Sequence, residues 1–468
     1  MADRPNVVVF FSDQQRWDTT GLNGCPLELT PNFDYWGSRG TVFPYATTPQ
    51  PVCGPARACL QTGKYATAVG DGCHTNGRLL PADHDSFAKR FADAGYTTGY
   101  FGKWHLGRNE HDENQAVIAE DRGGWDHWLA AQALEACSDG YHTILYDKDN
   151  RETKLPGYRV DAVADAGIRF IGEQAPTGEP FCMMISEIEP HMQNHRDAHP
   201  APAGYEERYR GRWTPPDLQT LPGVPGFYEH LTGGNAQQAL PGYLGSIKRL
   251  DEAFGRVMDA LISYGIADNT IVVYTSDHGC HFRTRNDEYK RSCHDVSIRV
   301  PCMIHGGPFT GGGRDERPFQ LTDLVPTLCD AAGVNAPEGA HGKSALGDLP
   351  DEAFVQISES HFGRAVRTNR WKYAAIAPNA KASDRHANDL VESHLYDLVA
   401  DPYELVNLAG QPDYAEVRAD MKQRLIRRME QAGEPTPTIA DTHRPKHEIG
   451  QQVQRETRPS DDLHPLTS

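Results

Sequence analysis

The sequence predicts an α/β fold built on a mostly parallel sheet. Two continuous apolar runs, residues 7–11 (VVVFF) and 270–275 (TIVVYT), are typical of strands that are buried on both faces. A third run, residues 181–185 (FCMMI), has the same character. Segments with helical spacing of apolar residues lie between these runs, and this alternation favours a parallel sheet covered by helices.

Five helices are expected before residue 350. One begins at Pro55, because proline is favoured in the first turn of a helix. Three more are expected where apolar residues recur with helical spacing, at residues 85–94, 160–173 and 239–264. Residues 321–333 predict a helix that ends at a glycine, and residues 298–303 predict a further strand.

Beyond about residue 350 the pattern changes. Residues 365–376 and 393–398 predict short antiparallel strands, and residues 415–432 predict an amphipathic helix. After Gly433 the chain is rich in proline, threonine, histidine and charge. We therefore expect a large α/β domain over residues 1–350, a small sheet-and-helix subdomain over 351–433, and an extended tail over 434–468 that is loosely ordered or mediates homo-oligomer formation.

Composition narrows the classes of partner. The 468 residues include 64 acidic and 46 basic side chains, a formal net charge of −18, which argues against nucleic acid as a partner. An anion site would need its own local positive charge. No stretch approaches the roughly 20 apolar residues that span a membrane. Ten scattered cysteines favour free thiols, and the first residues lack a signal-peptide layout, so we expect a cytoplasmic protein, or a periplasmic one if a leader was removed.

Polar side chains follow each of the three apolar runs. Asp13 and Gln14 follow the first, His191 follows the second along the chain, and Asp277 and His278 follow the third. Ligands bind outside the carboxyl ends of strands in open α/β sheets, so these side chains are expected at one edge. Carboxylate and amide oxygens with an imidazole suit Ca²⁺, Mg²⁺ or Mn²⁺. The alternative is that Asp13 and Asp277 only cap helices.

Cys53 and Arg57 lie in the segment PVCGPARACLQTGKYA, residues 51–66. A free cysteine is most often a small buried apolar residue. A helix that begins at Pro55 would instead place Cys53 near its positive end and Arg57 about one turn along. That arrangement lowers the pKa of a thiol and binds anions, so Cys53 is either a structural residue or a reactive one.

Five segments, in order along the chain, resemble the type I sulfatase family, which is formylglycine-dependent and belongs to the alkaline phosphatase superfamily. They are DQQRWD (13–18), CGPAR with LQTG (53–57 and 60–63), FGKWHLG (101–107), SDHG (276–279) and LYDLVADPYELVNL (395–408). The resemblance implies an alkaline-phosphatase-like fold, with a large mixed sheet flanked by helices and a small four-stranded sheet domain. It also implies a hydrolase of sulfate monoesters, whose expected substrate is a sulfated, acidic oligosaccharide.

The resemblance further implies a cofactor set. Cys53 would be oxidised to formylglycine by a formylglycine-generating enzyme, and one hydroxyl of the aldehyde hydrate would attack sulfur. A divalent metal would be held by Asp13, Gln14, Asp277, His278 and the modified Cys53. Ca²⁺ is the expected ion. Gln14 and His278 depart from the Asp-Asp and Asp-Asn pairs of many arylsulfatases, which leaves Mn²⁺ or Mg²⁺ as alternatives.

Other roles follow from the same resemblance. Arg57, Lys103 and Lys290 would neutralise the sulfuryl oxygens, and His191 or Lys290 would protonate the leaving oxygen. His105 would deprotonate the second hydroxyl of the hydrate, so that sulfate is expelled. The candidates for substrate contact are Asn76 and four residues of the charged run that follows the second metal loop: His281, Arg283, Arg285 and His294.

Two other functions stay open at this point. Asp-Gln and Asp-His pairs also occur in formylglycine-dependent phosphonate monoester and phosphodiester hydrolases of the same fold, although the Lys-x-His pair of FGKWHLG favours a sulfatase. A second alternative is a non-catalytic, sugar-binding member in which Cys53 is never converted.

Overall fold

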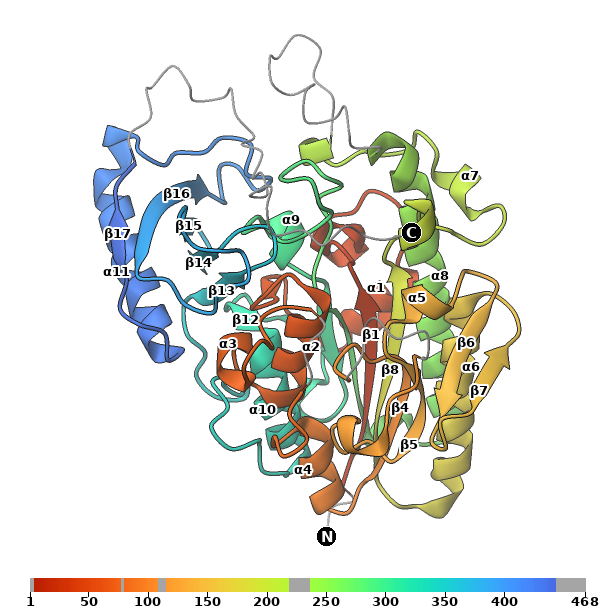
Figure 1. Ribbon diagram of the computed structural model, residues 1–468. Helices are drawn as coiled ribbons and strands as arrows, with labels where there is room; N and C mark the ends of the chain where they lie inside the picture. Colours follow the sequence, from red (N-terminus) through yellow and green to blue (C-terminus); the bar gives the residue numbers. More distant parts are fainter. Residues whose placement is uncertain (1–3, 77–79, 108–114, 219–235, 443–468) are drawn as a thin grey trace.

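The computed structural model describes residues 4–76, 80–107, 115–218 and 236–442 (Figure 1). Within these residues the main sheet has ten strands. Across the sheet they are β11 (Gly313–Arg314), β2 (Thr41–Val42), β10 (Cys302–His305), β9 (Thr270–Ser276), β1 (Asn6–Asp13), β8 (Phe181–Pro190), β4 (Thr97–Lys103), β5 (His127–Ala131), β6 (Thr143–Asp147) and β7 (Glu152–Leu155). The central strands from β9 to β5 are parallel, while β10 and β6 pair antiparallel on either side, so the sheet is mixed as expected.

The register of the central strands aligns their carboxyl ends. Ser12 pairs with Ser276 of β9, and Phe11 pairs with Ser186 of β8, which in turn pairs with Gly102 of β4. The residues that leave these four strands therefore emerge along one edge of the sheet. This register follows from continuous apolar strands, because each is buried on both faces and packs only when its apolar length is covered.

Helices cover both faces of this sheet. On one face α6 (Arg159–Gln174) and α8 (Ala236–Ser263) pack with α1 (Pro31–Gly37) around Val8 and Phe10. On the other face α2 (Cys53–Thr62), α4 (Phe87–Asp93) and α10 (Leu321–Ala332) pack around Val9 and Phe11 (Figure 1). Alternate residues of β1 thus fill two separate cores, as the strand period of two requires. The short helices are α3 (Ala66–Val69), α5 (Leu134–Cys137), α7 (Tyr205–Tyr209) and α9 (Asp295–Ile298).

A second sheet follows in the C-terminal part of the chain. Its order is β13 (Ala353–Ile357), β14 (Gly363–Arg367), β15 (Trp371–Ile376), β16 (Asp389–Asp397) and β17 (Thr438–Ala440), and β3 (Ala46–Thr47) pairs with β12 (Phe319–Gln320) elsewhere. The first four strands are antiparallel, and α11 (Ala415–Gln431) packs Met421 and Leu425 on the sheet. The alkaline-phosphatase-like architecture, a large mixed sheet with helices plus a small C-terminal sheet, is thereby confirmed.

Some boundaries differ from the expectation. Ile298 ends helix α9, and the strand expected at 298–303 begins only at Cys302, because residues 295–298 form one helical turn. Residues 438–440, expected in the tail, form β17 and pair with β16. Residues 443–468 of that tail lie outside the described residues. The expected domain limits at 350 and 433 stay predictions.

Two further observations bear on earlier expectations. All ten cysteines fall in the described ranges and none is paired in a disulfide, as expected for free thiols. None of the helices in the described ranges combines the length and apolar character that crossing a bilayer requires.

Candidate active site

The carboxyl end of β1 supplies Asp13 and Gln14. Asp13 is fully buried, and its Oδ2 atom lies 2.9 Å from Nζ of Lys103 and 3.0 Å from Nη2 of Arg57. Gln14 adopts φ of 69°, a region that non-glycine residues rarely enter. Its backbone N–H donates to Oδ1 of Asp277 at 3.0 Å, so the turn after β1 is tied to the residue after β9.

Asp277 and His278 follow β9 and are fully buried. Nδ1 of His278 lies 3.0 Å from the carbonyl oxygen of Gly279, which can only accept, so Nδ1 carries the proton. Nε2 is then an acceptor, and it lies 3.8 Å from Oδ1 of Asp13 and 3.6 Å from Oδ1 of Asp277. This is the tautomer that a metal-ligating histidine needs.

The two carboxylates differ in electrostatic environment. Burial and the nearby Asp13 charge raise the pKa of Asp277 to about 6. Burial also acts on Asp13, but Lys103 and Arg57 outweigh it and hold the pKa of Asp13 well below its usual range. The end of β1 therefore keeps a negative charge that a bound cation could share.

Cys53 is the first residue of α2, two positions earlier than the expected helix start. Its Sγ atom lies 2.7 Å from Nζ of Lys290, 3.3 Å from Nε2 of His278 and 3.7 Å from Oδ1 of Asp13. Burial opposes ionisation of the thiol, but the ammonium groups of Lys103 and Lys290 hold its pKa well below the ordinary range. Cys53 is therefore a thiol placed among cations and metal-type ligands, and not a simple core residue.

Arg57 lies one turn further along α2 and joins three strands. Its Nη1 atom donates to Oγ of Ser186 at 2.7 Å and to the carbonyl oxygen of Lys103 at 2.9 Å, while Nη2 donates to Asp13. The side chain is 2% exposed. The planar guanidinium thus fixes the relative positions of β1, β4 and β8 around Cys53.

Lys103 ends β4 and is buried with two carboxylates. Its Nζ atom lies 2.9 Å from Oδ2 of Asp13 and 2.7 Å from Oε1 of Glu135. These charges outweigh burial and raise the pKa of Lys103 well above its usual range, and Lys103 in turn lowers the pKa of the buried Glu135 to about 2. Lys103 is therefore a permanent positive charge beside Cys53.

His191 and Lys290 lie together on another side of Cys53. Nε2 of His191 is 3.2 Å from Nζ of Lys290, while Nδ1 of His191 is 2.6 Å from the carbonyl oxygen of Met192. The carbonyl oxygen of Lys290 accepts hydrogen bonds from Nε2 of His281 and Nδ2 of Asn286, at 2.9 and 3.0 Å. Two side chains that can carry a proton thus lie together, and one of them, Lys290, contacts Cys53.

His105 and Asn76 complete the surroundings of Cys53. His105 is 3% exposed, and its hydrogen bond to the thiol helps to lower the pKa of Cys53. Oδ1 of Asn76 accepts the backbone N–H of Gly54 at 2.9 Å, so Asn76 lies beside the first turn of α2.

The ligand set fits a divalent cation. One ligand atom from each of Asp13, Cys53, Asp277 and His278 lies within 4.8 Å of all the others, the one such group in the described part of the chain. Oε1 of Gln14 and Oδ2 of Asp277 are buried and accept no hydrogen bond, although Oδ2 of Asp277 lies 3.4 Å from Nη2 of Arg57. A buried acceptor without a hydrogen bond is costly, and a cation would satisfy both oxygens. These oxygen and nitrogen donors are the ones that Ca²⁺, Mg²⁺ and Mn²⁺ prefer.

Comparisons with known proteins agree with this geometry. The family model described as Sulfatase matches residues 5–334 of the chain. The chain belongs to the sulfatase family. A second model, described as N-sulphoglucosamine sulphohydrolase, C-terminal, matches residues 287–431, which include strands β13 to β16 and helix α11 of this sulfatase.

Individual relatives span nearly the whole sulfatase chain. It is 31% identical over 452 residues to an ulvan-active sulfatase of Formosa agariphila, with 92% of this chain and 82% of the relative covered. It is 25% identical to an N-acetylglucosamine-6-O-sulfatase of Bacteroides thetaiotaomicron, covering 94% and 88%. A solved structure in complex with its substrate D-glucosamine-2-N,6-O-disulfate superposes with a TM-score of 0.72 at 25% identity, covering 92% and 98%. The expected enzyme class, a sulfuric ester hydrolase, is confirmed.

Three residues expected to contact substrate in this sulfatase have protein partners instead. Besides the bond from His281 to Lys290, Arg285 donates to the carbonyl oxygens of Tyr403 and Glu404, and Nε2 of His294 lies 3.0 Å from the hydroxyl of Tyr396. All three are at most 1% exposed, and burial lowers the pKa of His281 to about 3. The structure does not bring their side chains to the metal-type cluster, because they anchor the segment that carries Lys290 to its surroundings. Substrate contact by them stays a prediction that these contacts do not support.

Arg283 is placed differently from these three. It is 31% exposed, but its guanidinium lies 3.1 Å from Oδ1 of Asp197 and 4.7 Å from the centre of the Tyr289 ring. Its charge is therefore already paired at the surface.

Sequence reasoning missed three residues near Cys53. Ser186 lies within β8 and binds Arg57, Glu135 lies in α5 and binds Lys103, and Glu359 lies between β13 and β14 and accepts from Asn76. None belongs to a matched segment. Ser186 directly follows the predicted strand at residues 181–185, so its position was a signal that the sequence reasoning did not use. Glu135 and Glu359 follow no predicted strand.

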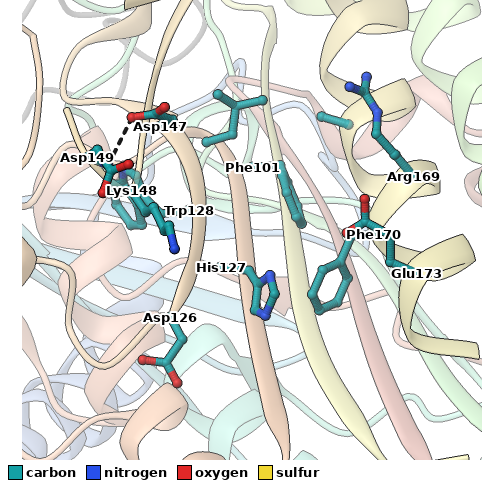
Figure 2. Close-up of a pocket in the computed structure, with 12 residues that line it drawn as sticks. Phe101, Asp126, His127, Trp128, Asp147, Lys148, Asp149, Arg169, Phe170 and Glu173 are labelled. Atoms are coloured by element: carbon teal, nitrogen blue, oxygen red, sulfur yellow. Dashed lines mark hydrogen bonds between the residues drawn. The ribbon is translucent and has the colours of Figure 1, made fainter. Parts of the chain in front are cut away.

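A separate pocket of 530 Å³ lies between α6 and the β5–β6 side of the main sheet (Figure 2). Figure 2 shows His127 beside Phe170 on its floor, with Asp147 and Asp149 on one side and Arg169 and Glu173 on the other. None of its lining residues belongs to the cluster around Cys53.

Proposed function

We propose that this protein hydrolyses sulfate monoesters of sulfated carbohydrates, using a formylglycine hydrate made from Cys53 and one bound divalent metal. The observation that carries the proposal is the convergence on Cys53 Sγ of Lys290 Nζ, His278 Nε2 and Asp13 Oδ1, within 2.7 to 3.7 Å. In the matured enzyme the hydroxyls of the hydrate take the place of this sulfur atom. A nucleophile there would be surrounded by cations and metal ligands at once.

Asp13, Gln14, Asp277 and His278 would hold the metal. A bound divalent cation lowers the pKa of a coordinated hydroxyl and stabilises the negative charge that develops on sulfate. We propose Ca²⁺, because three of these four side chains donate oxygen. The imidazole of His278 makes Mn²⁺ and Mg²⁺ the ions to compare with it.

The chain's own side chains divide the remaining tasks. Lys103 and Lys290 supply positive charge where sulfuryl oxygens gather negative charge. His191 and Lys290 lie 3.2 Å apart, so either can deliver a proton to the leaving oxygen while the other keeps its position. His105 contacts the reactive group directly and is the proposed base for the second hydroxyl.

A sulfated sugar is the proposed substrate because of the relatives. One relative is named an ulvan-active sulfatase, and another is named an N-acetylglucosamine-6-O-sulfatase. A third was solved in complex with its substrate, a glucosamine disulfate. These descriptions apply to those proteins and not to this one, but each refers to a sulfated carbohydrate. Conversion of Cys53 requires a formylglycine-generating enzyme as a partner during maturation. The cytoplasmic location and the homo-oligomer through the tail stay predictions.

The test is sulfate release by protein co-expressed with a formylglycine-generating enzyme. Mass spectrometry of the peptide that contains Cys53 first establishes the fraction converted. Converted protein should release sulfate from sulfated oligosaccharides faster than it hydrolyses bis(4-nitrophenyl) phosphate or a phosphonate monoester. A preference for the diester or the phosphonate would support the phosphohydrolase alternative, and converted protein without any turnover would support a binding role.

A further inference from the structure

A cluster of three partly exposed side chains lies beside Cys53 and has no part in the chemistry described so far. It consists of Asn76, Arg291 and Glu359, and we name it the Glu359 cluster. The carboxylate of Glu359 accepts the backbone N–H of Asn76, and its Oε2 atom lies 2.6 Å from Nη2 of Arg291. Glu359 comes from the connection between β13 and β14, so the small sheet supplies it (Figure 1).

Two residues of the Glu359 cluster are each linked to a direct neighbour of Cys53. Asn76 accepts the N–H of Gly54, the residue after Cys53. Arg291 follows Lys290, whose Nζ atom contacts Cys53. When a sulfate ester is bound at Cys53 with its alcohol portion facing Lys290, that alcohol portion would therefore lie next to Glu359.

Charge at the cluster favours hydroxyl groups over a second anion. The guanidinium of Arg291 is shared by two carboxylates, Glu359 at 2.6 Å and Glu288 at 2.8 Å. These three side chains together carry a net charge of −1. Arg283 is paired with Asp197 and Arg285 binds backbone carbonyls, so neither offsets this charge at the cluster.

Glu359 has room to accept a further hydrogen bond. An ionised carboxylate has about four lone-pair positions. Oε1 of Glu359 accepts the backbone N–H of Asn76, and Oε2 accepts from Nη2 of Arg291 and, at 3.5 Å, from Nδ2 of Asn76, so one position is left and the side chain is still 16% exposed. Its φ of 68° is unusual for a non-glycine residue, so the backbone at Glu359 adopts a conformation that carries some cost.

We propose that Glu359 determines substrate specificity by accepting a hydrogen bond from an uncharged hydroxyl group of the sugar unit that carries the sulfate ester. The substrate class is then a sulfated neutral sugar, and the sulfated ring carries no carboxylate on the side that faces Glu359. This inference rests on the proposed function and adds to it the kind of sugar that the site recognises.

The test compares two leaving groups in converted enzyme. One is the sulfated monosaccharide that the wild type hydrolyses fastest, from a panel that includes N-acetylglucosamine 6-sulfate, glucose 6-sulfate and a sulfated glucuronate. The other is 4-nitrophenyl sulfate, which has no hydroxyl next to the ester. Glu359→Gln should lower kcat/KM for the sugar about 10- to 100-fold, as expected for loss of a hydrogen bond to a charged acceptor, and should change the aryl value far less.

The matched control is Glu288→Gln, which removes a carboxylate from the same guanidinium without touching Asn76. It should leave the ratio of the two kcat/KM values unchanged. If Glu359 only holds Arg291 and Asn76 in place, Glu359→Gln will lower both values equally, and the proposal is overturned. Should that variant fail to fold, Glu359→Asp tests the same ratio with the charge kept.

Two results with the wild-type enzyme also test the specificity proposal. Faster hydrolysis of the sulfated glucuronate than of the neutral sugars overturns the specificity proposal while the proposed function stands. No sulfate release from any sugar of the panel overturns both, and the sulfate released from 4-nitrophenyl sulfate then shows whether sulfatase activity itself is present.

Discussion

Nζ of Lys290 lies 2.7 Å from Sγ of Cys53, although 237 residues separate them along the chain. Lys290 belongs to a charged loop segment. Its carbonyl oxygen accepts hydrogen bonds from His281 and Asn286 of the same segment, so the loop itself fixes the position of Lys290.

Replacing Cys53 should remove turnover. Cys53→Ala has no nucleophile, and Cys53→Ser has one hydroxyl in place of the two that a hydrate offers, so sulfate would stay bound to the enzyme. We expect kcat to fall by about 10³-fold or more in both variants, measured as sulfate released per enzyme. Cys59→Ala, at a fully buried position later in the same helix, is the control and should change stability by about 1 kcal/mol while turnover is kept. Normal turnover by Cys53→Ser would disprove the role of the hydrate.

Removal of the metal should lower both activity and thermal stability. A cation that binds only the native state at about 100 times its Kd adds about 2.7 kcal/mol to the free energy of unfolding. Treatment with EDTA should therefore lower Tm and sulfate release, and addition of Ca²⁺, Mn²⁺ or Mg²⁺ should restore them in the order of affinity. Gln14→Asp adds a carboxylate and should tighten Ca²⁺ binding, measured by titration of Tm against the ion. Insensitivity of both Tm and activity to EDTA would contradict a metal at this cluster.

Replacing Ser186 should lower kcat through its effect on Arg57. Its hydroxyl accepts a hydrogen bond from the buried guanidinium at 2.7 Å, and loss of a partner leaves a charged donor unsatisfied. Ser186→Ala should lower kcat about 10-fold, because Arg57 joins the strands that carry Asp13 and Lys103. Ser246→Ala, a buried serine of α8, is the control and should leave kcat unchanged. Equal kinetics of the two variants would show that Arg57 holds its position without Ser186.

Acid should weaken the contact between helix α9 and the small sheet, because this contact depends on the charge of Asp295. Arg367 and Lys372 lie 2.9 and 2.6 Å from its carboxylate, and they outweigh burial and hold the pKa of Asp295 well below its usual range. The pKa of an aspartate in the unfolded chain is about 4, so this stabilisation is complete above about pH 5 and is lost as the pH falls below it. Asp295→Asn should lower the free energy of unfolding by about 3–5 kcal/mol at pH 7.

The measurement is chemical unfolding at several pH values. Between pH 5 and pH 3 the wild type should lose stability more steeply than Asp295→Asn does. Glu152→Gln removes an exposed charge paired with Lys154, and it should change stability by less than about 1 kcal/mol. Parallel pH curves for wild type and Asp295→Asn would contradict the assignment.

Much of the fold could be predicted from local pattern. The apolar runs located β1, β8 and β9, and helical spacing located α6, α8 and α10 within a few residues of their ends. Short elements near the site were harder. The segment 298–303 is apolar enough for a strand, but its first residue ends helix α9, since Asp295 at its start is bound by Arg367 and Lys372 of the small sheet.

Local sequence pointed to most members of the cluster around Cys53. Asp13 and Asp277 follow apolar runs that predict strands, and Cys53 and Arg57 lie on either side of the helix start predicted at Pro55. Lys103 is indicated only by the resemblance of FGKWHLG to the sulfatase family. Tertiary structure alone decided what surrounds these residues. Ser186, Glu135 and Glu359 reach the site through contacts between segments far apart in the chain. It also turned His281, Arg285 and His294 toward protein groups, because buried charges and imidazoles need partners, and packing decides which partner is near.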